Sequence, residues 1–291
     1  MASMKDIKRR KESIQSTGQI TKAMKLVSTV KLQKARGRAE SARPYFAAMY
    51  GTVSAMLARS GNIEHRYLKP GETSKKAVIV ITANRGLAGG YNSNITKLVT
   101  SSGISPEDAL IYAVGTKGRD FLSRRGYEIK ADFSEVINEP IFPDAMEIGK
   151  TVLEAFERGE AGEIYLAYTS FKNTVVHEPK LVKLLPISPG DVTGEERGGQ
   201  ASDEAMTLVS YEPEEEEALD IIIPKYINSL IYGALMEAVA SENGARMTAM
   251  DNATSNAEEI ISDLSLMYNR ARQGSITQEL TEIIAGANAI S

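Results

Sequence analysis

Residues 32–56 read LQKARGRAESARPYFAAMYGTVSAM, and the spacing of the apolar residues in this stretch decides the fold of the N-terminal part of the chain. Successive apolar positions are separated by alternating intervals of three and four residues, which places them on one face of an α-helix. Such a stripe is typical of a helix that pairs with another helix. The positions are Leu32, Ala35, Ala39, Ala42, Phe46, Met49, Val53 and Met56.

The same helix is expected to extend in both directions, from Ser3 as its N-cap to about Arg59. Pro44 lies off the stripe, so we expect a kink there and not the end of the helix. Nearer the N-terminus, apolar residues lie on one broad face with a looser spacing. These residues are Ile7, Ile14, Ile20, Met24 and Val27.

The C-terminal part of the chain repeats this design. Pro213 and the acidic residues 214–217 indicate the start of a helix, because the positive end of the helix dipole favours carboxylates. We expect this helix to bend at Pro224 and to run to about Ala287. Its three-four stripe comprises Met250, Ala253, Ala257, Ile260, Leu264, Met267 and Ala271.

The two helices are expected to pair antiparallel and to differ in length. Residues 3–58 span roughly 84 Å as a helix and residues 213–287 roughly 112 Å. If the basic residues near Arg43 face the acidic start of the second helix, paired residue numbers sum to about 275 to 280, and the first helix ends opposite residue 275 or so. An apolar stripe beyond that point has no partner in the chain, so another protein should cover it. The stripe comprises Ile276, Leu280, Ile283, Ile284, Ala287 and Ile290.

The middle of the chain has a different periodicity, typical of an α/β domain. Buried strands are predicted at 76–82 and 109–115, later strands at 163–171, 180–187 and 206–211, and helices at 93–100, 117–125 and 143–158. The strand-helix-strand order predicts a Rossmann-like domain with a largely parallel sheet. The expected organisation is therefore a helix in residues 1–60, an α/β domain in residues 75–210 and a helix in residues 211–291, the two helices forming a long antiparallel coiled coil.

A glycine-rich stretch, TANRGLAGGYNSN at 82–94, follows the first predicted strand. A glycine-rich turn in this place can bind phosphate at a helix N-terminus. The spacing of its glycines matches neither the dinucleotide fingerprint nor a P-loop, and a turn that presents Arg85 to a partner explains it better. A nucleotide-binding domain remains the enzymatic alternative.

Composition narrows the function further. The 291 residues include no cysteine and two histidines, His65 and His177, so neither a thiolate metal site nor a histidine-based catalytic centre stands out. We expect no cofactor, no metal and no membrane-spanning segment. Residues 1–43 carry a marked excess of Lys and Arg. A nucleic-acid-binding arm would explain that excess, but stacking aromatics are missing there and a protein-facing helix is favoured.

Four stretches together resemble the gamma subunit of the F-type ATP synthase. They are IKRRKESIQSTGQITKAMKLVSTVKLQKA at 7–35, NRGLAGGYNSNI at 84–95, YINSLIYGALMEAVASENGARMTAMDNATSNAEEII at 226–261 and LMYNRARQGSITQELTEIIAGANAI at 266–290. They occur in the family's order and cover both helices and the core of the middle domain. A coiled-coil adaptor unrelated to rotation is the remaining structural alternative.

The resemblance implies a non-catalytic rotor, the central stalk. Its C-terminal end would fill the axial cavity of a hexamer of alpha and beta subunits, and its α/β domain would lie beside the epsilon subunit and on the ring of c subunits. Ion flow would turn the ring and the stalk, and the stalk would drive each beta subunit through its nucleotide states. The resemblance also implies one copy per complex and a peripheral position on the cytoplasmic face of a bacterial plasma membrane, since no transit peptide precedes Met1.

The resemblance also implies contact residues. Beta-subunit contacts are expected at Met24, Lys25, Arg85, Gly86, Leu87, Ala88, Arg246, Arg272, Gln273, Thr277 and Glu279, and c-ring contacts at Tyr211 and Glu212. Within this set, Arg272 and Gln273 match positions that meet a loop of beta, and Arg85 to Ala88 match a segment near an acidic loop of beta. The family often has a cysteine where this chain has Ala88, and the chain lacks the regulatory cysteine insert of the chloroplast form.

Overall fold

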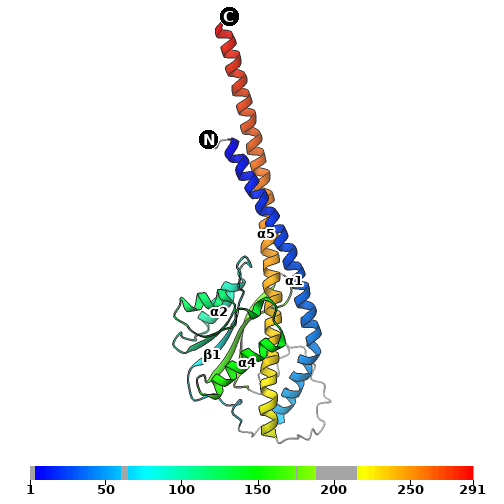
Figure 1. Ribbon diagram of the computed structural model, residues 1–291, viewed down its shortest axis with the longest axis vertical. Coiled ribbons are helices and arrows are strands. Elements are labelled where there is room, and N and C mark those ends of the chain that lie inside the picture. Colours follow the sequence, from blue (N-terminus) through cyan, green and yellow to red (C-terminus); the bar gives the residue numbers. More distant parts are fainter. Residues whose placement is uncertain (1–3, 60–64, 175, 188–214, 291) are drawn as a thin grey trace. The chain divides into compact units, whose positions relative to one another are not determined.

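The computed structural model describes residues 4–59, 65–174, 176–187 and 215–290. The chain divides into two compact units, one formed by Met1–Thr29 with Arg246–Ser291 and the other by Val30–Ala245. Helices α1 (Met4–Arg59) and α5 (Glu215–Ile290) each contribute to both units (Figure 1). Both helices continue through their internal prolines, Pro44 and Pro224, as predicted.

The Val30–Ala245 unit contains a five-stranded sheet with the strand order β3-β2-β1-β4-β5. The strands are β1 (Lys76–Ile81), β2 (Ala109–Val114), β3 (Glu128–Asp132), β4 (Glu163–Phe171) and β5 (His177–Leu185). Strands β1 to β4 are parallel, and β5 runs antiparallel to β4. The predicted α/β class with a largely parallel sheet is confirmed.

Strand β3 was not predicted, and β5 begins at His177 instead of Lys180. Both strands lie at an edge of the sheet. In β3, exposed and half-buried residues alternate, so the strand lacks the apolar run by which a central strand is recognised. Edge strands with charged side chains therefore escape a search for buried runs.

Helices cover both faces of this sheet (Figure 1). They are α2 (Tyr91–Ser101), α3 (Thr116–Ser123) and α4 (Phe142–Glu157), with a short 3-10 helix η1 (Val136–Asn138) before α4. Alternate residues of β1 point to opposite sides: Val78 and Val80 pack with α2, whereas Ile79 and Ile81 belong to the larger core with α4. That larger core also contains Val53 to Leu57 of α1 and the segment of α5 from Ala218 to Ala238.

The predicted stripe at 32–56 is confirmed, because all eight positions are buried or half-buried. Leu32, Ala35, Val53 and Met56 are the most deeply buried of them. Ring contacts continue the pairing of α1 with α5. Phe46 of α1 meets Tyr232 of α5 edge to face, with their ring centroids 6.2 Å apart, and the Phe46 centroid lies 6.1 Å from that of Tyr45. The stripe thus joins α1 to α5 and to the sheet within one unit.

The other unit is a pair formed by the N-terminal part of α1 and the C-terminal part of α5. Gly18 faces Ala257, Thr21 faces Thr254 and Lys25 faces Asp251, so paired residue numbers sum to 275 or 276. The helices are therefore antiparallel in the predicted alignment.

Four residues predicted on the paired faces of this unit are exposed instead: Ile20, Val27, Ile260 and Met267. Met267, for example, is 55% exposed, and the neighbouring Tyr268 is half-buried. A single partner helix covers only a narrow stripe, and here that stripe runs through small and polar side chains such as Gly18 and Thr21. Hydrophobicity alone therefore misplaced these four residues, whereas Met250, Ala257 and Leu264 of the predicted α5 stripe are buried.

Candidate functional site: an uncovered helix end and a braced loop

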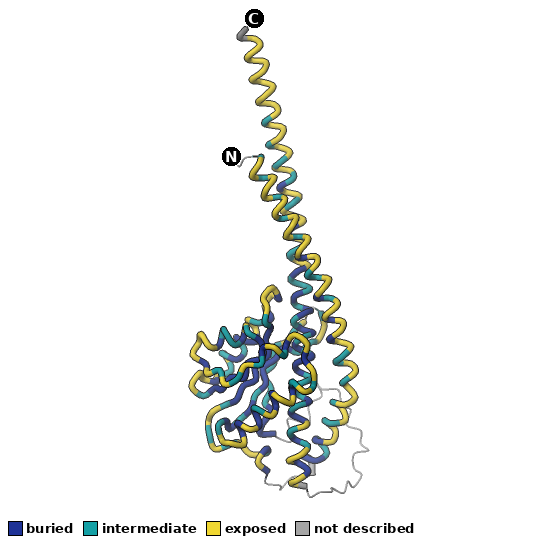
Figure 2. Tube along the Cα trace, viewed as in Figure 1, coloured by how far each residue is buried: buried dark blue, intermediate teal, exposed yellow. Residues whose placement is uncertain are grey.

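The end of α5 carries the predicted uncovered stripe. Every residue from 276 to 288 is exposed, and Ile283 reaches 67% exposure (Figure 2). Ile276, Leu280, Ile283, Ile284 and Ala287 share one helix face by their three-four spacing. This prediction is confirmed for Ile276 to Ala287, whereas the side chain of Ile290 lies outside the described residues.

The polar residues of this segment bond within the helix. Gln278 donates to Glu282 at 3.0 Å, and the Thr281 hydroxyl donates to the carbonyl oxygen of Thr277 at 2.8 Å. Glu279 and Glu282 are the only charged residues between 276 and 288. An exposed helix face with four large aliphatic side chains and no charge is a surface that a groove of another protein can cover.

Arg272 and Gln273 lie one turn before this stripe and are exposed. Among the described residues, neither side chain forms an ion pair or a hydrogen bond. Thr277 and Glu279, also predicted contacts, are exposed on the next turn. These four exposed polar residues lie at the start of the apolar stripe, and we call them the polar collar. They are Arg272, Gln273, Thr277 and Glu279.

The other predicted contacts of this unit are less accessible. Met24 is half-buried, and Arg246 is buried. Lys25 is half-buried, and its Nζ lies 2.5 Å from Oδ1 of Asp251. The charge of Lys25 is thus already opposed by a carboxylate of its own chain.

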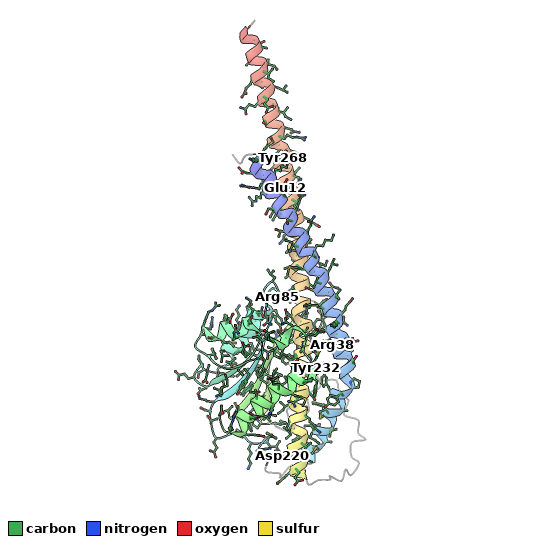
Figure 3. All side chains as sticks on the ribbon, in the orientation of Figure 1. Glu12, Arg38, Arg85, Asp220, Tyr232 and Tyr268 are labelled. Carbon is green, nitrogen blue, oxygen red and sulfur yellow. The ribbon has the colours of Figure 1, made fainter. Side chains whose placement is uncertain are left out.

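The predicted loop at Arg85 to Ala88 joins β1 to α2 in the other unit (Figure 3). Leu87 has a φ of 62° and is 64% exposed, while Ala88 is buried in a small cluster with Ala83, Tyr91 and Ala245. Arg85 and Gly86 are exposed. A bulky residue in the left-handed region is uncommon and strained, and nothing in the sequence predicted it.

Two asparagines brace this loop. Asn92 accepts a hydrogen bond from the amide of Ala83 at 2.9 Å and donates to the carbonyl oxygen of Arg85 at 3.4 Å. Asn84 accepts from the amide of Thr116 at 2.9 Å and donates to the carbonyl oxygen of Ser134 at 2.7 Å. These bonds hold the loop in a shape that presents Leu87 and Arg85 outward.

The α/β domain is tied to both long helices by ionic contacts that were not predicted. Glu139, next to η1, accepts hydrogen bonds from Lys34 at 2.6 Å and Arg38 at 2.8 Å, which lower the pKa of its carboxyl group. At the start of α5, Asp220 accepts from His65 at 3.1 Å and from Arg66 at 3.0 Å. These contacts join residues distant in sequence, so no local pattern could have predicted them.

The segment that carries His65 and Arg66 is itself well anchored. The Tyr67 hydroxyl donates to Glu157 of α4 at 2.6 Å, and burial together with this bond raises the pKa of Tyr67. Arg66 lies 4.8 Å from the Tyr67 ring centre. The segment therefore fastens α4 to the first turns of α5.

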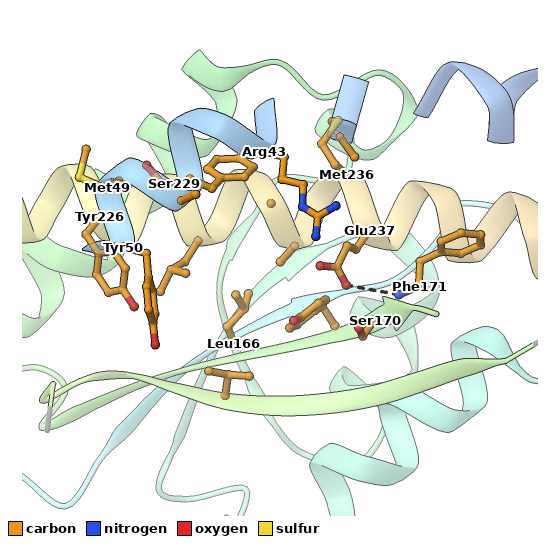
Figure 4. Close-up of a pocket in the computed structure, with 18 of the residues that line it drawn as sticks. Arg43, Met49, Tyr50, Leu166, Ser170, Phe171, Tyr226, Ser229, Met236 and Glu237 are labelled. Atoms are coloured by element: carbon orange, nitrogen blue, oxygen red, sulfur yellow. Dashed lines mark hydrogen bonds between the residues drawn. The ribbon is translucent and has the colours of Figure 1, made fainter. Parts of the chain in front are cut away.

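A cavity of about 830 Å³ lies between α1, the β4–β5 pair and α5 in this unit (Figure 4). Leu166, Tyr168, Tyr226 and Met236 are buried residues of its wall. On its rim, Arg43 points toward Glu237, whose Oε2 accepts a hydrogen bond from the amide of Phe171 at 3.3 Å. Nothing in the sequence predicted this cavity, because its lining comes from three separate parts of the chain.

Clusters of side chains that could bind a metal ion or catalyse a reaction are scarce in the described ranges. Within them, no three His, Asp or Glu side chains gather in a way that could hold a metal ion. No helix in the same ranges is long and apolar enough to cross a membrane. The predicted c-ring contacts, Tyr211 and Glu212, lie outside the described residues, as do the Ser3 cap, Pro213 and the strand predicted at 206–211.

The fold and the exposed surfaces define a structural subunit of a larger assembly: two long helices with an uncovered apolar end, attached to an α/β domain. A family model described as ATP synthase matches residues 3–290. The chain is 70% identical to the ATP synthase gamma chain of Lachnoclostridium phytofermentans over the full length of both chains. It is 43% identical to the ATP synthase gamma chain, sodium ion specific, of Acetobacterium woodii, with 99% of each chain covered. The chain therefore belongs to the family of ATP synthase gamma chains.

A solved structure agrees with this assignment. A chain in the central stalk and c-ring structure of the Tetrahymena thermophila mitochondrial ATP synthase superimposes with a TM-score of 0.60 and 28% identity, covering 80% of this chain and 99% of that chain. The predicted family and fold class are thus confirmed. As a member of this family, the chain is a non-catalytic stalk subunit of the ion-transporting ATP synthase.

Proposed function

We propose that this chain is the rotor that couples ion-driven rotation of a ring of c subunits to conformational changes at the catalytic sites of beta subunits. The observation that carries this proposal is the uncovered stripe at the end of α5, from Ile276 to Ala287. A lone helix with an exposed apolar face needs a covering protein. The axial cavity of a hexamer of alpha and beta subunits would supply that cover.

A rotating helix needs a surface that does not bind its surroundings more tightly at one rotation angle than at another. Charged side chains on the stripe would form ion pairs at particular angles, whereas an apolar face has no directional bonds to break. The stripe meets this requirement, since its residues Ile276, Leu280, Ile283, Ile284 and Ala287 carry no charge. Angle-dependent contacts would instead come from the polar collar of Arg272, Gln273, Thr277 and Glu279.

The collar and the loop are the proposed sites of coupling to beta. Exposed groups without a partner in the described chain, such as Arg272 and Gln273, are free to bond differently to each conformation of beta. A rotor can shift a catalytic site only by such differential contacts. Met24, Lys25 and Arg246 would support these contacts from the paired part of the helices, and Arg85 to Ala88 would meet beta from the α/β domain.

The α/β domain and the residues just before α5 are the proposed site at which the c ring applies torque to the chain. Tyr211 and Glu212, just before α5, would meet the c ring, and the α/β domain would lie beside an epsilon subunit. The contacts of Asp220 with His65 and Arg66, and of Glu139 with Lys34 and Arg38, would then pass force from the α/β domain to both helices. The complex would hold one copy of this chain, on the cytoplasmic face of a bacterial plasma membrane.

Co-expression with alpha and beta subunits from the same source tests the proposal. We expect the full chain to co-purify with them and a chain that ends at Ser275 to be lost from the complex while its α/β domain stays folded. A full chain that remains alone would contradict the proposal. Calorimetry on the isolated chain addresses the enzymatic alternative, which requires tight binding of ATP or NAD.

A further inference from the structure

In the paired helices of the Met1–Thr29 and Arg246–Ser291 unit, α1 contributes polar residues to the seam. Among the described residues of α1 in this unit, the buried ones are Thr21 at 8% and Ser28 at 2% exposure. The neighbouring Ile20, Leu26 and Val27 are exposed. A helix pair ordinarily buries its apolar residues and exposes its polar ones. On α1 that order is reversed, and the buried apolar residues of this unit, Met250, Ala257 and Leu264, lie on α5.

The seam is also lined by small residues. A β-carbon added to Gly18 would lie 3.4 Å from Cβ of Ala257, which is ordinary contact distance. Small residues let two helices approach closely, but they lack the large side chains that interlock and thereby fix one alignment. Contacts between polar groups of the two helices can therefore contribute to the alignment of α1 on α5 in this unit.

Two polar contacts on neighbouring turns can set it. The Thr21 and Thr254 hydroxyls lie 2.7 Å apart, and the Lys25 ammonium lies 2.5 Å from the Asp251 carboxylate. A shift of one helical turn would bring Lys25 to Met247 or Ser255, and neither residue carries a negative charge. Polar groups in an otherwise apolar or small seam are a well-supported means of specifying register.

We propose that Thr21, Lys25, Asp251 and Thr254 form a register lock, which keeps α1 and α5 in one alignment while the helix pair carries torque. The part of this proposal that concerns torque depends on the proposed function, whereas the part that concerns the alignment of the helices does not. The Lys25–Asp251 pair is largely exposed, so it adds little to the free energy of unfolding. Its effect is expected in the alignment of the helices, and these four residues act as positioning residues.

The chain has no cysteine, so an engineered pair reports the alignment directly. Gly18→Cys with Ala257→Cys tests the observed register, because the Cβ separation suits a disulfide. Gly18→Cys with Ile261→Cys tests a register shifted by one turn. In the full chain, we expect rapid oxidation of the first pair and slow oxidation of the second.

Charge reversal then tests the lock. Lys25→Asp or Asp251→Lys places like charges opposite each other, and each should slow the first disulfide several-fold and speed the second. The double reversal should restore both rates. Lys22→Asp makes the same change of charge on the same helix, where no ion pair exists among the described residues, and should leave the rates unchanged. Thr21→Val, which keeps the shape, should weaken the alignment in the same direction as charge reversal.

Equal disulfide rates in the single reversals, the double reversal and the control would overturn the register lock. Because the rates are read in the full chain alone, they do not depend on assembly with other subunits. In the assembled complex, the single reversals should lower the number of ions pumped per ATP hydrolysed, and the double reversal should restore it. Loss of assembly by the unaltered chain would instead contradict the proposed function and leave the disulfide result standing.

Discussion

Gly244 of α5 lies so close to His177 of β5 that a β-carbon on the glycine would be 2.8 Å from Cε1 of the imidazole. The neighbouring contacts hold the same strands to the helix: the Ser241 hydroxyl donates to the carbonyl oxygen of Thr169 at 3.2 Å, and Glu237 accepts from the amide of Phe171. The β4–β5 pair is thus seated on α5 where the helix has no side chain. Glycine is required there by space, not by backbone conformation.

The first prediction concerns this close approach. Gly244→Ala should lower the free energy of unfolding by up to about 2 kcal/mol, because the overlap of the added methyl group with the imidazole outweighs the gain in helix propensity. Gly233→Ala is the matched control on the same helix, where the added carbon would lie 3.6 Å from Phe46. It should raise the free energy of unfolding by about 0.5–1 kcal/mol through helix propensity. Urea denaturation measures both, and equal effects would show that the contact does not limit the packing.

The second prediction concerns pH. Burial lowers the pKa of His177 from its ordinary value of 6.5. Below that value the unfolded chain binds a proton more readily than the folded chain, so the free energy of unfolding should fall as the pH decreases from about 6.5 toward the lowered pKa. Above pH 6.5 this residue contributes no pH dependence. Urea midpoints from pH 7.5 to 5.0 check this, and His177→Gln should flatten the slope in that window.

The third prediction concerns the left-handed residue Leu87. Leu87→Gly should raise the free energy of unfolding by about 1 kcal/mol, because glycine adopts a positive φ without strain. In the complex it should lower coupled turnover, because the exposed leucine side chain is lost. Leu87→Asn separates the two effects, since asparagine tolerates this backbone conformation but is polar. Coupled turnover that is unchanged in both variants would show that the side chain makes no functional contact.

The fourth prediction concerns the apolar stripe of α5. Ile283→Glu with Ile284→Glu should reduce assembly with alpha and beta subunits, because charges would be buried in the covering groove. Gln278→Glu lies off the stripe and should assemble normally. Neither variant should change the unfolding of the α/β domain, since these residues are exposed in the chain alone. Normal assembly of the double variant, measured by co-purification, would remove the stripe from the interface. Deletion of Ile283–Ser291 should act in the same direction.

The fifth prediction concerns the polar collar. Arg272→Ala with Gln273→Ala should lower ATP turnover and coupling while leaving assembly and the affinity of the complex for nucleotide unchanged. The reason is that these exposed groups would contact beta and not the nucleotide. Arg270→Ala is a control, because Arg270 is exposed on the same helix outside the proposed collar. Full turnover in the double variant would contradict the proposed role of the collar.

The elements predicted correctly are those whose own residues form a recognisable apolar pattern. The stripe at 32–56 was placed correctly because its residues are apolar and buried or half-buried, and Met49, Val53 and Met56 pack in the core that α5 and the sheet share. The uncovered end of α5 followed from helix lengths alone. Strand β3 was missed because an edge strand needs no apolar run, and Leu87 was missed as a strained residue because φ depends on the bonds of Asn84 and Asn92.

Part of the seam in the Met1–Thr29 and Arg246–Ser291 unit was misplaced for a different reason. The usual inference assumes that the most apolar face of a helix meets the partner in its own chain. In this unit the apolar residues Ile20, Val27 and Met267 face outward, and the small and polar residues meet each other. A single sequence does not separate an apolar face that another protein covers from a seam within the chain.

The uncovered end of α5 also has a consequence for the chain between its synthesis and its assembly with partners. A newly made chain exposes Ile276, Leu280, Ile283 and Ile284 until a partner covers them. Such a surface binds chaperones, promotes aggregation and invites proteolysis. Surplus chains would therefore be removed, and the supply of this subunit would be matched to the number of hexamers available to receive it.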